Sequence, residues 1–129
     1  MANHPSLFDP PPSPSPRDGS IPAPVARAVA LDPLIHERSR LGIVAALASG
    51  SGTRSFRELR DALSLSDGNL GAHLRRLEEA GVVECRKGFE ERVPCSRYRL
   101  TVRGRASFAS YLFRLESVLR ATRGVRDAG

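Results

Sequence analysis

The sequence predicts a mainly α-helical fold with one small β-hairpin. Three observations support this fold class. Two helix-sized segments with their own start signals meet at a short turn within residues 55–80. Two short segments that alternate apolar and polar residues follow within 82–100, and Thr101 then begins a last helix. This order of elements is that of a winged helix-turn-helix.

The first thirty residues differ in composition from the rest of the chain. Eight of the ten prolines lie between Pro5 and Pro24, where they remove backbone donors and favour extended polyproline II conformations. We therefore predict a disordered, proline-rich tail over residues 1–30, a folded domain over 31–120 and a flexible C-terminus over 121–129.

The net charge of +6 lies on residues 31–129, because the tail carries as many acidic as basic residues. An excess of positive charge on a domain of this size favours a polyanionic partner. Charge alone is equally compatible with simple solubility, so the motifs have to decide between the two interpretations.

The first helix is predicted from Asp32 to Ala48. Asp32 is a good N-cap, and Pro33 suits the first helical position, where its missing N–H costs nothing. Apolar residues cover more of this helix than a single small core requires. Burial against a second copy of the chain is one explanation, and an unusually enclosed helix is the other.

Two serines mark the starts of the next two helices. Ser55 begins a capping box with Glu58, which predicts a helix of about two turns. Ser66 is a second N-cap, and it precedes a helix predicted over Asp67 to Ala80. Two short helices joined by so tight a turn must cross at a steep angle, as in a helix-turn-helix.

The helix over 67–80 has a narrow apolar stripe and a mixed outer arc. Its inward stripe consists of Leu70, Leu74 and Leu77. Small residues, an amide, an imidazole and two guanidiniums are left outside, and this mixture suits a helix in the major groove of DNA. The predicted DNA contacts of this helix are Ser66, Asp67, Asn69, Ala72, His73, Arg75 and Arg76.

Individual residues on this arc have distinct predicted roles. Asn69 can read adenine and Arg76 can read guanine by paired hydrogen bonds, whereas Arg75 is better placed for phosphate. The alternative is a plain solvated face. Gly68 and Gly71 argue against it, because each costs about 1 kcal/mol in a helix relative to alanine without an evident packing return.

The wing is predicted as strands over Val82 to Lys87 and Ser96 to Leu100, with Gly88 to Pro94 as the loop between them. Its positive charge suits phosphates or a minor groove. Glu90 and Glu91 at the tip weaken that interpretation, and charges on a hairpin also protect its edge from pairing. The predicted DNA contacts of the wing are Arg86, Lys87, Arg92 and Arg97.

Thr101 caps a final helix that is predicted to reach about Arg120. Its broad apolar surface suggests contact with both the domain's core and a partner subunit; packing entirely on its own domain is the alternative. A dimer built on the first and last helices would place two reading helices about 34 Å apart, as a palindrome requires. The predicted dimer interface comprises Leu34, Ile35, Phe108, Tyr111, Leu112, Leu115, Val118 and Leu119.

Other chemistry finds little support in the sequence. Cys85, Cys95 and three histidines form no closely spaced ligand set, so we predict no metal and no cofactor. Strand alternation turns Cys85 inward and Cys95 outward, so a disulfide across the hairpin would need a register shift. We see no catalytic set and no motif for a small-molecule ligand. No signal peptide or membrane span is evident, and we expect a cytoplasmic protein.

Several segments together resemble the small MarR/ArsR-type winged-helix transcriptional regulators of bacteria. They are Leu31–Leu41, Ser55–Leu59, Leu65–Gly81 and Tyr98–Arg105. The resemblance covers about residues 31–115 and omits the tail, and the wing carries fewer basic residues than the family pattern. It implies a dimeric DNA-binding regulator, often a repressor, with base or backbone contacts at Asp67, Asn69, His73 and Arg76.

The leading hypothesis is therefore a homodimeric transcriptional regulator that binds duplex DNA at a short palindrome and is not an enzyme. The alternative is a winged-helix module for protein–protein contact, with the proline-rich tail as a second docking element. The two hypotheses differ at Arg75 and Arg76, since only DNA readout requires both guanidiniums to contact nucleic acid.

Overall fold

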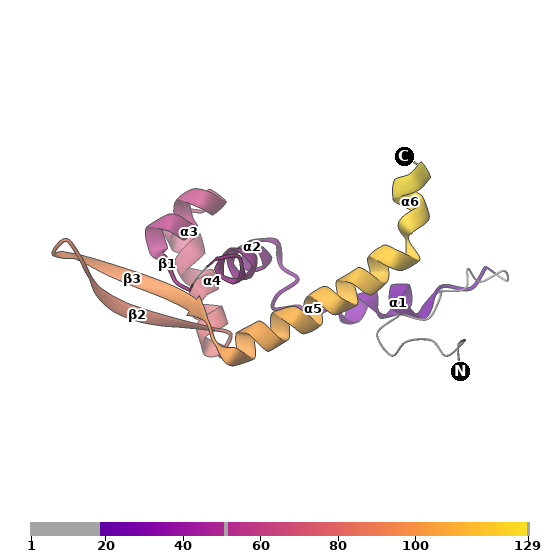
Figure 1. The fold of residues 1–129 in the computed structure, drawn as a ribbon, viewed down its shortest axis with the longest axis horizontal. Helices are drawn as coiled ribbons and strands as arrows, with labels where there is room; N and C mark the ends of the chain where they lie inside the picture. The colour runs from indigo at the N-terminus through magenta and orange to yellow at the C-terminus, as the bar shows by residue number, and fades with distance from the viewer. Residues whose placement is uncertain (1–18, 51, 129) are drawn as a thin grey trace, which may run out of the picture.

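The computed structural model describes residues 19–50 and 52–128. Its sheet is antiparallel with strand order β1-β3-β2, so the predicted mainly helical winged fold is confirmed. Figure 1 shows the β2–β3 hairpin and α5 extending in opposite directions from the group formed by α2, α3 and α4. The elements are α1 (Ala23–Ala26), η1 (Arg27–Ala30), α2 (Arg38–Ala48), β1 (Arg54–Ser55), α3 (Phe56–Leu63), α4 (Asp67–Glu79), β2 (Val83–Glu90), β3 (Val93–Leu100), α5 (Val102–Ala121) and α6 (Arg123–Ala128).

The helix predicted from Asp32 begins instead at Arg38. Glu37 is its N-cap, and the Glu37 side chain accepts a hydrogen bond from the Arg40 N–H at 2.8 Å. Asp32 caps only a turn, in which its carboxylate accepts from the Leu34 N–H at 2.9 Å. The prediction was wrong because the turn lets Ile35 pack against α5, and this burial outweighs continuation of the helix.

The two serine caps are confirmed. The Ser55 hydroxyl accepts from the Glu58 N–H at 3.0 Å, and the Ser66 hydroxyl accepts from the Asn69 N–H at 3.1 Å. Between the two helices Ser64 adopts a left-handed conformation with φ 53°, which ends α3 and lets α4 start after a short turn. These caps define where each helix of the helix-turn-helix begins, and so how short the turn between them is.

The main core lies between α2, α3, α4 and the sheet. Leu70, Leu74 and Leu77 are fully buried there, as their spacing predicts, and so is Leu59, while Tyr98 is buried beside them. A second cluster joins the chain before α2 to α5, and it consists of Leu31, Ile35 and Tyr111. The folded part of the chain therefore has a winged-helix core and a smaller core built on α5.

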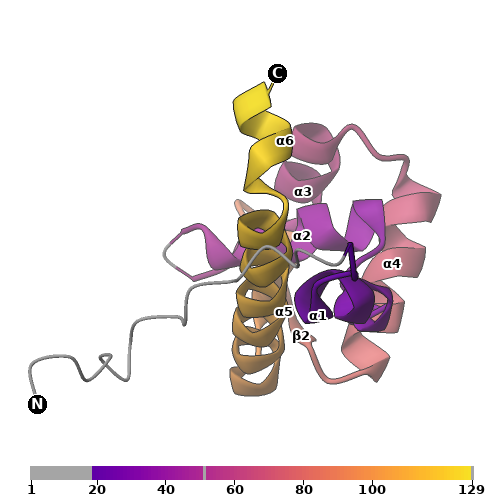
Figure 2. The ribbon, with the colours of Figure 1, turned by 90° about the vertical axis from the view of Figure 1, so that its right-hand side faces the viewer.

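Part of the predicted tail is ordered. Residues 23–30 form α1 and η1, both of which contact α5, and Figure 2 shows α1 beside α5. Pro24 stands at the start of α1, where proline is tolerated, and three of the six residues that follow are alanine. The prediction of disorder was therefore wrong for 23–30, and residues 1–18 lie outside the described part of the chain.

The wing is longer than predicted. β2 reaches Glu90 and β3 begins at Val93, so the predicted loop over 88–94 is reduced to two residues. Glu91 and Arg92 have φ values of 50° and 69°, which is the backbone of a type I′ turn. β1 pairs with β3 only at Tyr98 and Arg97, so β3 has a free edge at Pro94, where proline is tolerated.

The base of the wing is joined tightly to α5. Thr101 caps α5 by accepting from the Gly104 N–H at 2.9 Å, and the Thr101 N–H donates to the Val82 carbonyl at 3.0 Å. A Cβ at Gly104 would lie 2.0 Å from that same carbonyl oxygen. Only glycine allows this approach, so the direction of α5 is fixed relative to the hairpin.

Residues 123–128 are helical, although a flexible segment was predicted over 121–129. Thr122 interrupts the helix after α5, and the Val125 N–H donates to the Thr122 carbonyl at 3.0 Å as α6 begins. The helical hydrogen bonding therefore resumes after one residue, which sequence pattern did not indicate. Among the described residues, no helix combines the length and apolar character needed to span a bilayer.

Candidate nucleic-acid interface

Three residues on the outward arc of α4 have no side-chain partner among the described residues. Asn69, Arg75 and Arg76 are exposed, and within the described residues their side chains make no hydrogen bond or ion pair. A Cβ added at Gly68 or Gly71 would meet nothing within 4 Å. The two glycines therefore serve no packing purpose inside the protomer, although each lowers the stability of the helix.

Asp67, a predicted DNA contact, is held by the preceding helix. Arg60 Nη1 donates to Asp67 Oδ1 at 3.1 Å, and Arg60 Nε donates to Asp61 Oδ1 at the same distance. Hydrogen bonds to Asp67 and then Asp61 raise the pKa of the Arg60 guanidinium. The pairing with Arg60 offsets the negative charge of Asp67 at the start of α4, and Arg60 was not among the predicted site residues.

His73 faces α2 more than the outward arc. Its Nδ1 lies 3.2 Å from Nη1 of Arg40 and 3.8 Å from Oε2 of Glu37, and the side chain is about 22% exposed. Arg40 is itself buried and donates from Nε to the Leu34 carbonyl at 2.6 Å. This geometry makes His73 a residue that positions α4 on α2.

The charge of Glu37 supports that arrangement. Partial burial opposes ionisation of its carboxyl, but the backbone N–H groups of Arg40 and Ser39 and the charges of His73 and Arg40 outweigh it. The net result is a lowered pKa for Glu37. The carboxylate that caps α2 therefore also contacts the side chain of His73 on α4.

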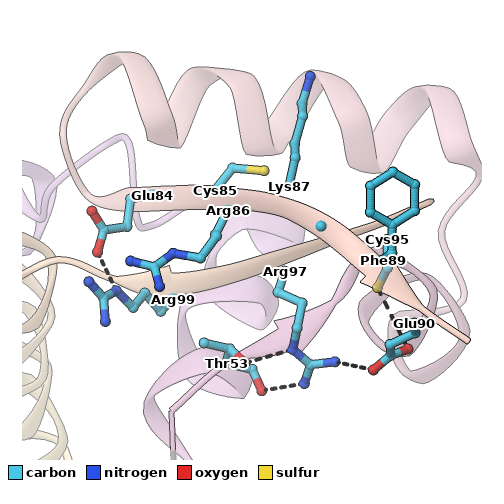
Figure 3. Close-up of a pocket in the computed structure, with 11 residues that line it drawn as sticks. Thr53, Glu84, Cys85, Arg86, Lys87, Phe89, Glu90, Cys95, Arg97 and Arg99 are labelled. Atoms are coloured by element: carbon cyan, nitrogen blue, oxygen red, sulfur yellow. Dashed lines mark hydrogen bonds and ion pairs between the residues drawn. The ribbon is translucent and has the colours of Figure 1, made fainter. Parts of the chain in front are cut away.

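The basic residues of the wing are divided between the two faces of the hairpin. The strand register places Arg86 opposite Arg97 on one face, and alternation places Lys87 on the other. Figure 3 shows Lys87 and Phe89 pointing away from Arg86 and Arg97. The four predicted wing contacts therefore do not form one basic surface, because the pleat divides them between two faces.

Arg97 is tied to neighbouring strands and loops. Its Nε donates to the Thr53 hydroxyl at 2.7 Å, its Nη2 to the Thr53 carbonyl at 3.2 Å and its Nη1 to Glu90 Oε1 at 3.1 Å. Arg99 is likewise paired with Glu84. Three predicted wing contacts remain exposed without an ion pair among the described residues, and these are Arg86, Lys87 and Arg92.

The face with Arg86 is concave and encloses about 470 Å³ (Figure 3). Gly88 lies opposite Cys95 and adds no side chain, so this part of the hairpin stays open. Cys85 pairs in register with Tyr98, which puts the two cysteines on opposite faces, as predicted, and both are free thiols. Burial, together with a hydrogen bond to Cys85, raises the pKa of the Tyr98 hydroxyl.

The predicted dimer residues have different environments. Ile35 and Tyr111 are buried inside the protomer, and the Tyr111 hydroxyl lies 2.7 Å from His36 Nδ1. Burial raises the pKa of Tyr111. These two residues are therefore unavailable to a partner, because the turn before α2 packs on α5. Leu34, Phe108, Leu115 and Val118 are half-buried, and the exposed members are Leu112 and Leu119.

Comparison with known proteins identifies the fold and the class of function. The profile of the winged helix DNA-binding domain family matches residues 39–119. The chain belongs to this family. The protein is thus a DNA-binding transcriptional regulator of the winged-helix type and not an enzyme, as the sequence predicted.

Individual proteins agree with this assignment. An uncharacterized protein of Methanocaldococcus jannaschii is 35% identical over 72 residues, which are 56% of this chain and 78% of that protein. The structure of a transcriptional regulator homologue from Pyrococcus horikoshii superimposes with TM-score 0.66 and 26% identity, over 73% of this chain and 92% of that one. A putative MarR-family regulator from Enterococcus faecalis shares the fold, with TM-score 0.59, 24% identity and coverage of 85% and 94%. The predicted resemblance to winged-helix transcriptional regulators is confirmed.

Proposed function

We propose that this winged-helix regulator is a homodimeric repressor that acts in the cytoplasm on a short palindrome. In this proposal α4 enters the major groove, and the β2–β3 hairpin lies on the backbone or in the minor groove. The observation that carries the proposal is the outward arc of α4, where Asn69, Arg75 and Arg76 are unpartnered in the described chain. Gly68 and Gly71 leave open space beside them for the close approach of DNA.

Exposed apolar residues on α5 support the dimer. Phe113 is 67% exposed, while Leu112 and Leu119 are more than two-fifths exposed. Large apolar side chains that gather on one terminal helix favour burial against a second copy, and a two-fold axis is the commonest way to achieve it. Phe113 was absent from the predicted interface because it lies beside the regular apolar stripe of the helix.

The decisive experiment is selection of bound fragments from random duplex DNA with the full chain. A dimer is expected to enrich two inverted half-sites with centres one helical turn apart, about 34 Å. Enrichment of a single half-site without symmetry would contradict the palindrome, and no enrichment at all would favour the protein-interaction alternative. Transcription in vitro from a promoter that contains the selected site then tests repression.

The dimer is tested separately by Phe113→Asp. Sedimentation should show the variant as a monomer with an unchanged helical circular dichroism spectrum, because Phe113 is largely exposed in the protomer. Val102→Asp is the matched control, since Val102 is 88% exposed at the other end of α5. A dimer that survives Phe113→Asp, or dissociates equally with Val102→Asp, would place the interface elsewhere.

A further inference from the structure

The end of the β2–β3 hairpin carries an aromatic side chain that the protomer does not cover. Phe89 is 75% exposed, and its cross-strand partner Pro94 is exposed as well. Phe89 packs against neither of the two hydrophobic clusters of the described chain. An exposed phenylalanine at the end of an arm therefore contributes little to folding, and exposed apolar surface of this kind is typical of binding sites.

The strand register places Phe89 on the side of the sheet where α4 lies. Cys85 and Phe89 share one face of β2, because side chains alternate along a strand. At the inner end of that face, Cys85 and Tyr98 pack in the core that also contains Leu74 of α4. Phe89 lies four residues beyond Cys85, which is about 14 Å along an extended strand. Phe89 therefore projects past the helices on the same side as α4.

A free cation accompanies Phe89 on this face. Lys87 precedes it by two residues, and Figure 3 shows both side chains pointing away from Arg97. Lys87 is exposed and has no ion pair among the described residues. An aromatic ring beside a free ammonium group suits a partner that offers both anionic and flat apolar groups, and duplex DNA offers phosphates and bases.

The turn at the tip is close to electrically neutral. Glu91 and Arg92 contribute one charge of each sign, and Glu90 is paired with Arg97 at 3.1 Å. Phosphate contact alone therefore does not explain what the tip binds. Apolar side chains such as phenylalanine enter the minor groove of DNA in another way, because they insert between base steps, partly unstack them and bend the duplex.

We propose that Phe89 is an apolar wedge that inserts between base pairs in the minor groove beside the major groove occupied by α4, while Lys87 contacts phosphate. This inference rests on the proposed binding of α4 to DNA and adds a bend to it. The insertion should favour steps that unstack easily, such as TA. It should also favour A·T pairs, because their minor groove lacks the amino group of guanine.

The test is a fluorescence titration of the full chain with the duplex enriched by selection, in which alternating A·T pairs flank the half-sites. 2-Aminopurine replaces one flanking adenine, and its fluorescence rises when the base is unstacked. The wild-type chain is expected to cause this rise. Phe89→Ala should abolish the rise and weaken binding about tenfold, whereas Phe89→Leu should keep most of the rise because leucine is also a wedge.

A second set of duplexes identifies the groove. G·C flanks should weaken binding by the wild-type chain, and inosine·C flanks should restore it, because inosine lacks only the amino group in the minor groove. Phe89→Ala should bind the two duplexes equally. Equal binding of both duplexes by the wild-type chain would overturn insertion in the minor groove.

Val93→Ala is the matched control, because Val93 is 62% exposed at the same tip but lies on the opposite face of the hairpin. An equal loss in Val93→Ala would overturn the proposal, as would an undiminished rise in Phe89→Ala. Dissociation of the dimer by Phe89→Ala in sedimentation would show that a second copy covers Phe89. DNA binding without any rise would overturn the wedge alone, whereas failure to enrich any duplex would overturn DNA binding as well.

Discussion

The α4 helix and the β2–β3 hairpin both carry arginines, but the two elements use them differently. On α4, Arg75 and Arg76 have no partner within the described chain. On the hairpin, Arg97 is bonded to Thr53 and Glu90, and Arg99 is paired with Glu84. The hairpin has five basic residues against two on the helix, whereas the contacts leave three without a partner in the described hairpin, Arg86, Lys87 and Arg92, against two on α4.

The number of basic residues on an element is therefore a poor guide to DNA binding. What matters more is whether each basic side chain already has a partner inside the protein. A guanidinium that already has carboxylate partners must give up those interactions before it can bind phosphate, so its net contribution is small. The free arginines of α4 lose only solvent contacts. We therefore expect the cations of α4 to supply sequence preference, and those of the wing, whose free Arg86 and Lys87 lie on opposite faces, to supply a modest, sequence-independent contribution.

The largest expected effect comes from α4. Arg76→Ala should reduce affinity for the selected site by about 10- to 100-fold and relax base preference at one position, because a bidentate contact to a base contributes roughly 1–3 kcal/mol. Arg75→Ala is the matched control. It should weaken binding uniformly across sequences and lower the salt dependence by about one phosphate contact. Unchanged binding by both variants in titrations with labelled DNA would reverse the ranking of helix over wing.

A smaller effect is expected within the wing, where Arg86 and Arg97 are directly opposed. Arg97→Ala should lower the free energy of unfolding by about 1 kcal/mol, because it removes hydrogen bonds to Thr53 and Glu90. Arg86→Ala should leave stability unchanged and reduce DNA affinity a few-fold. Urea unfolding and DNA titration of both variants test this division. The contrast between helix and wing is lost if Arg97→Ala impairs binding without loss of stability.

Substitution of Gly71 on α4 is expected to change stability and DNA binding in opposite directions. Gly71→Ala should stabilise the free protein by up to about 1 kcal/mol, because alanine favours the helix and its Cβ meets nothing within 4 Å. If the DNA backbone approaches this position, the same methyl group should weaken binding. Thermal unfolding and DNA titration together measure both effects, with Gly68→Ala as the second site. A variant that gains stability and binds DNA normally would exclude close approach at Gly71.

The smallest effect concerns the contact that holds α4 on α2. Because the pKa of Glu37 is lowered in the folded protein, its ionised form stabilises the fold above its ordinary pKa of 4.5, and this stabilisation is lost as pH falls through the lowered value. Glu37→Gln should therefore reduce stability by about 0.5 kcal/mol at pH 7 and by nothing at the lowest pH. Unfolding measured from pH 7 to pH 3 tests this, with Glu79→Gln as an exposed control. A difference that persists at low pH would mean that the carboxylate charge is unimportant.

The elements of the winged helix that depend on local signals were predictable. Ser55, Ser66 and Thr101 each cap the helix that the sequence assigned to them. A hydroxyl and an amide three residues apart form such a cap without help from the rest of the chain. The strand alternation likewise placed Cys85 and Cys95 on opposite faces, because that alternation depends only on the pleat.

The parts that failed depend on distant contacts. Residues 23–30 are helical only in the presence of α5, since so short a helix is unstable alone. The position of His73 depends on Arg40, which lies 33 residues earlier in the chain. Capping at Glu37 in place of Asp32 reflects the packing of Ile35 on Tyr111. No local pattern encodes any of these pairings.

Local signals in the sequence are enough to define the order of the elements, their caps and the apolar stripe that turns Asn69, Arg75 and Arg76 outward, because helix periodicity and capping act over a few residues. Which cations have no partner depends instead on tertiary contacts. The hydrogen bonds and ion pairs of the wing arginines to Thr53, Glu84 and Glu90 depend on strand register and on loops that folding brings together.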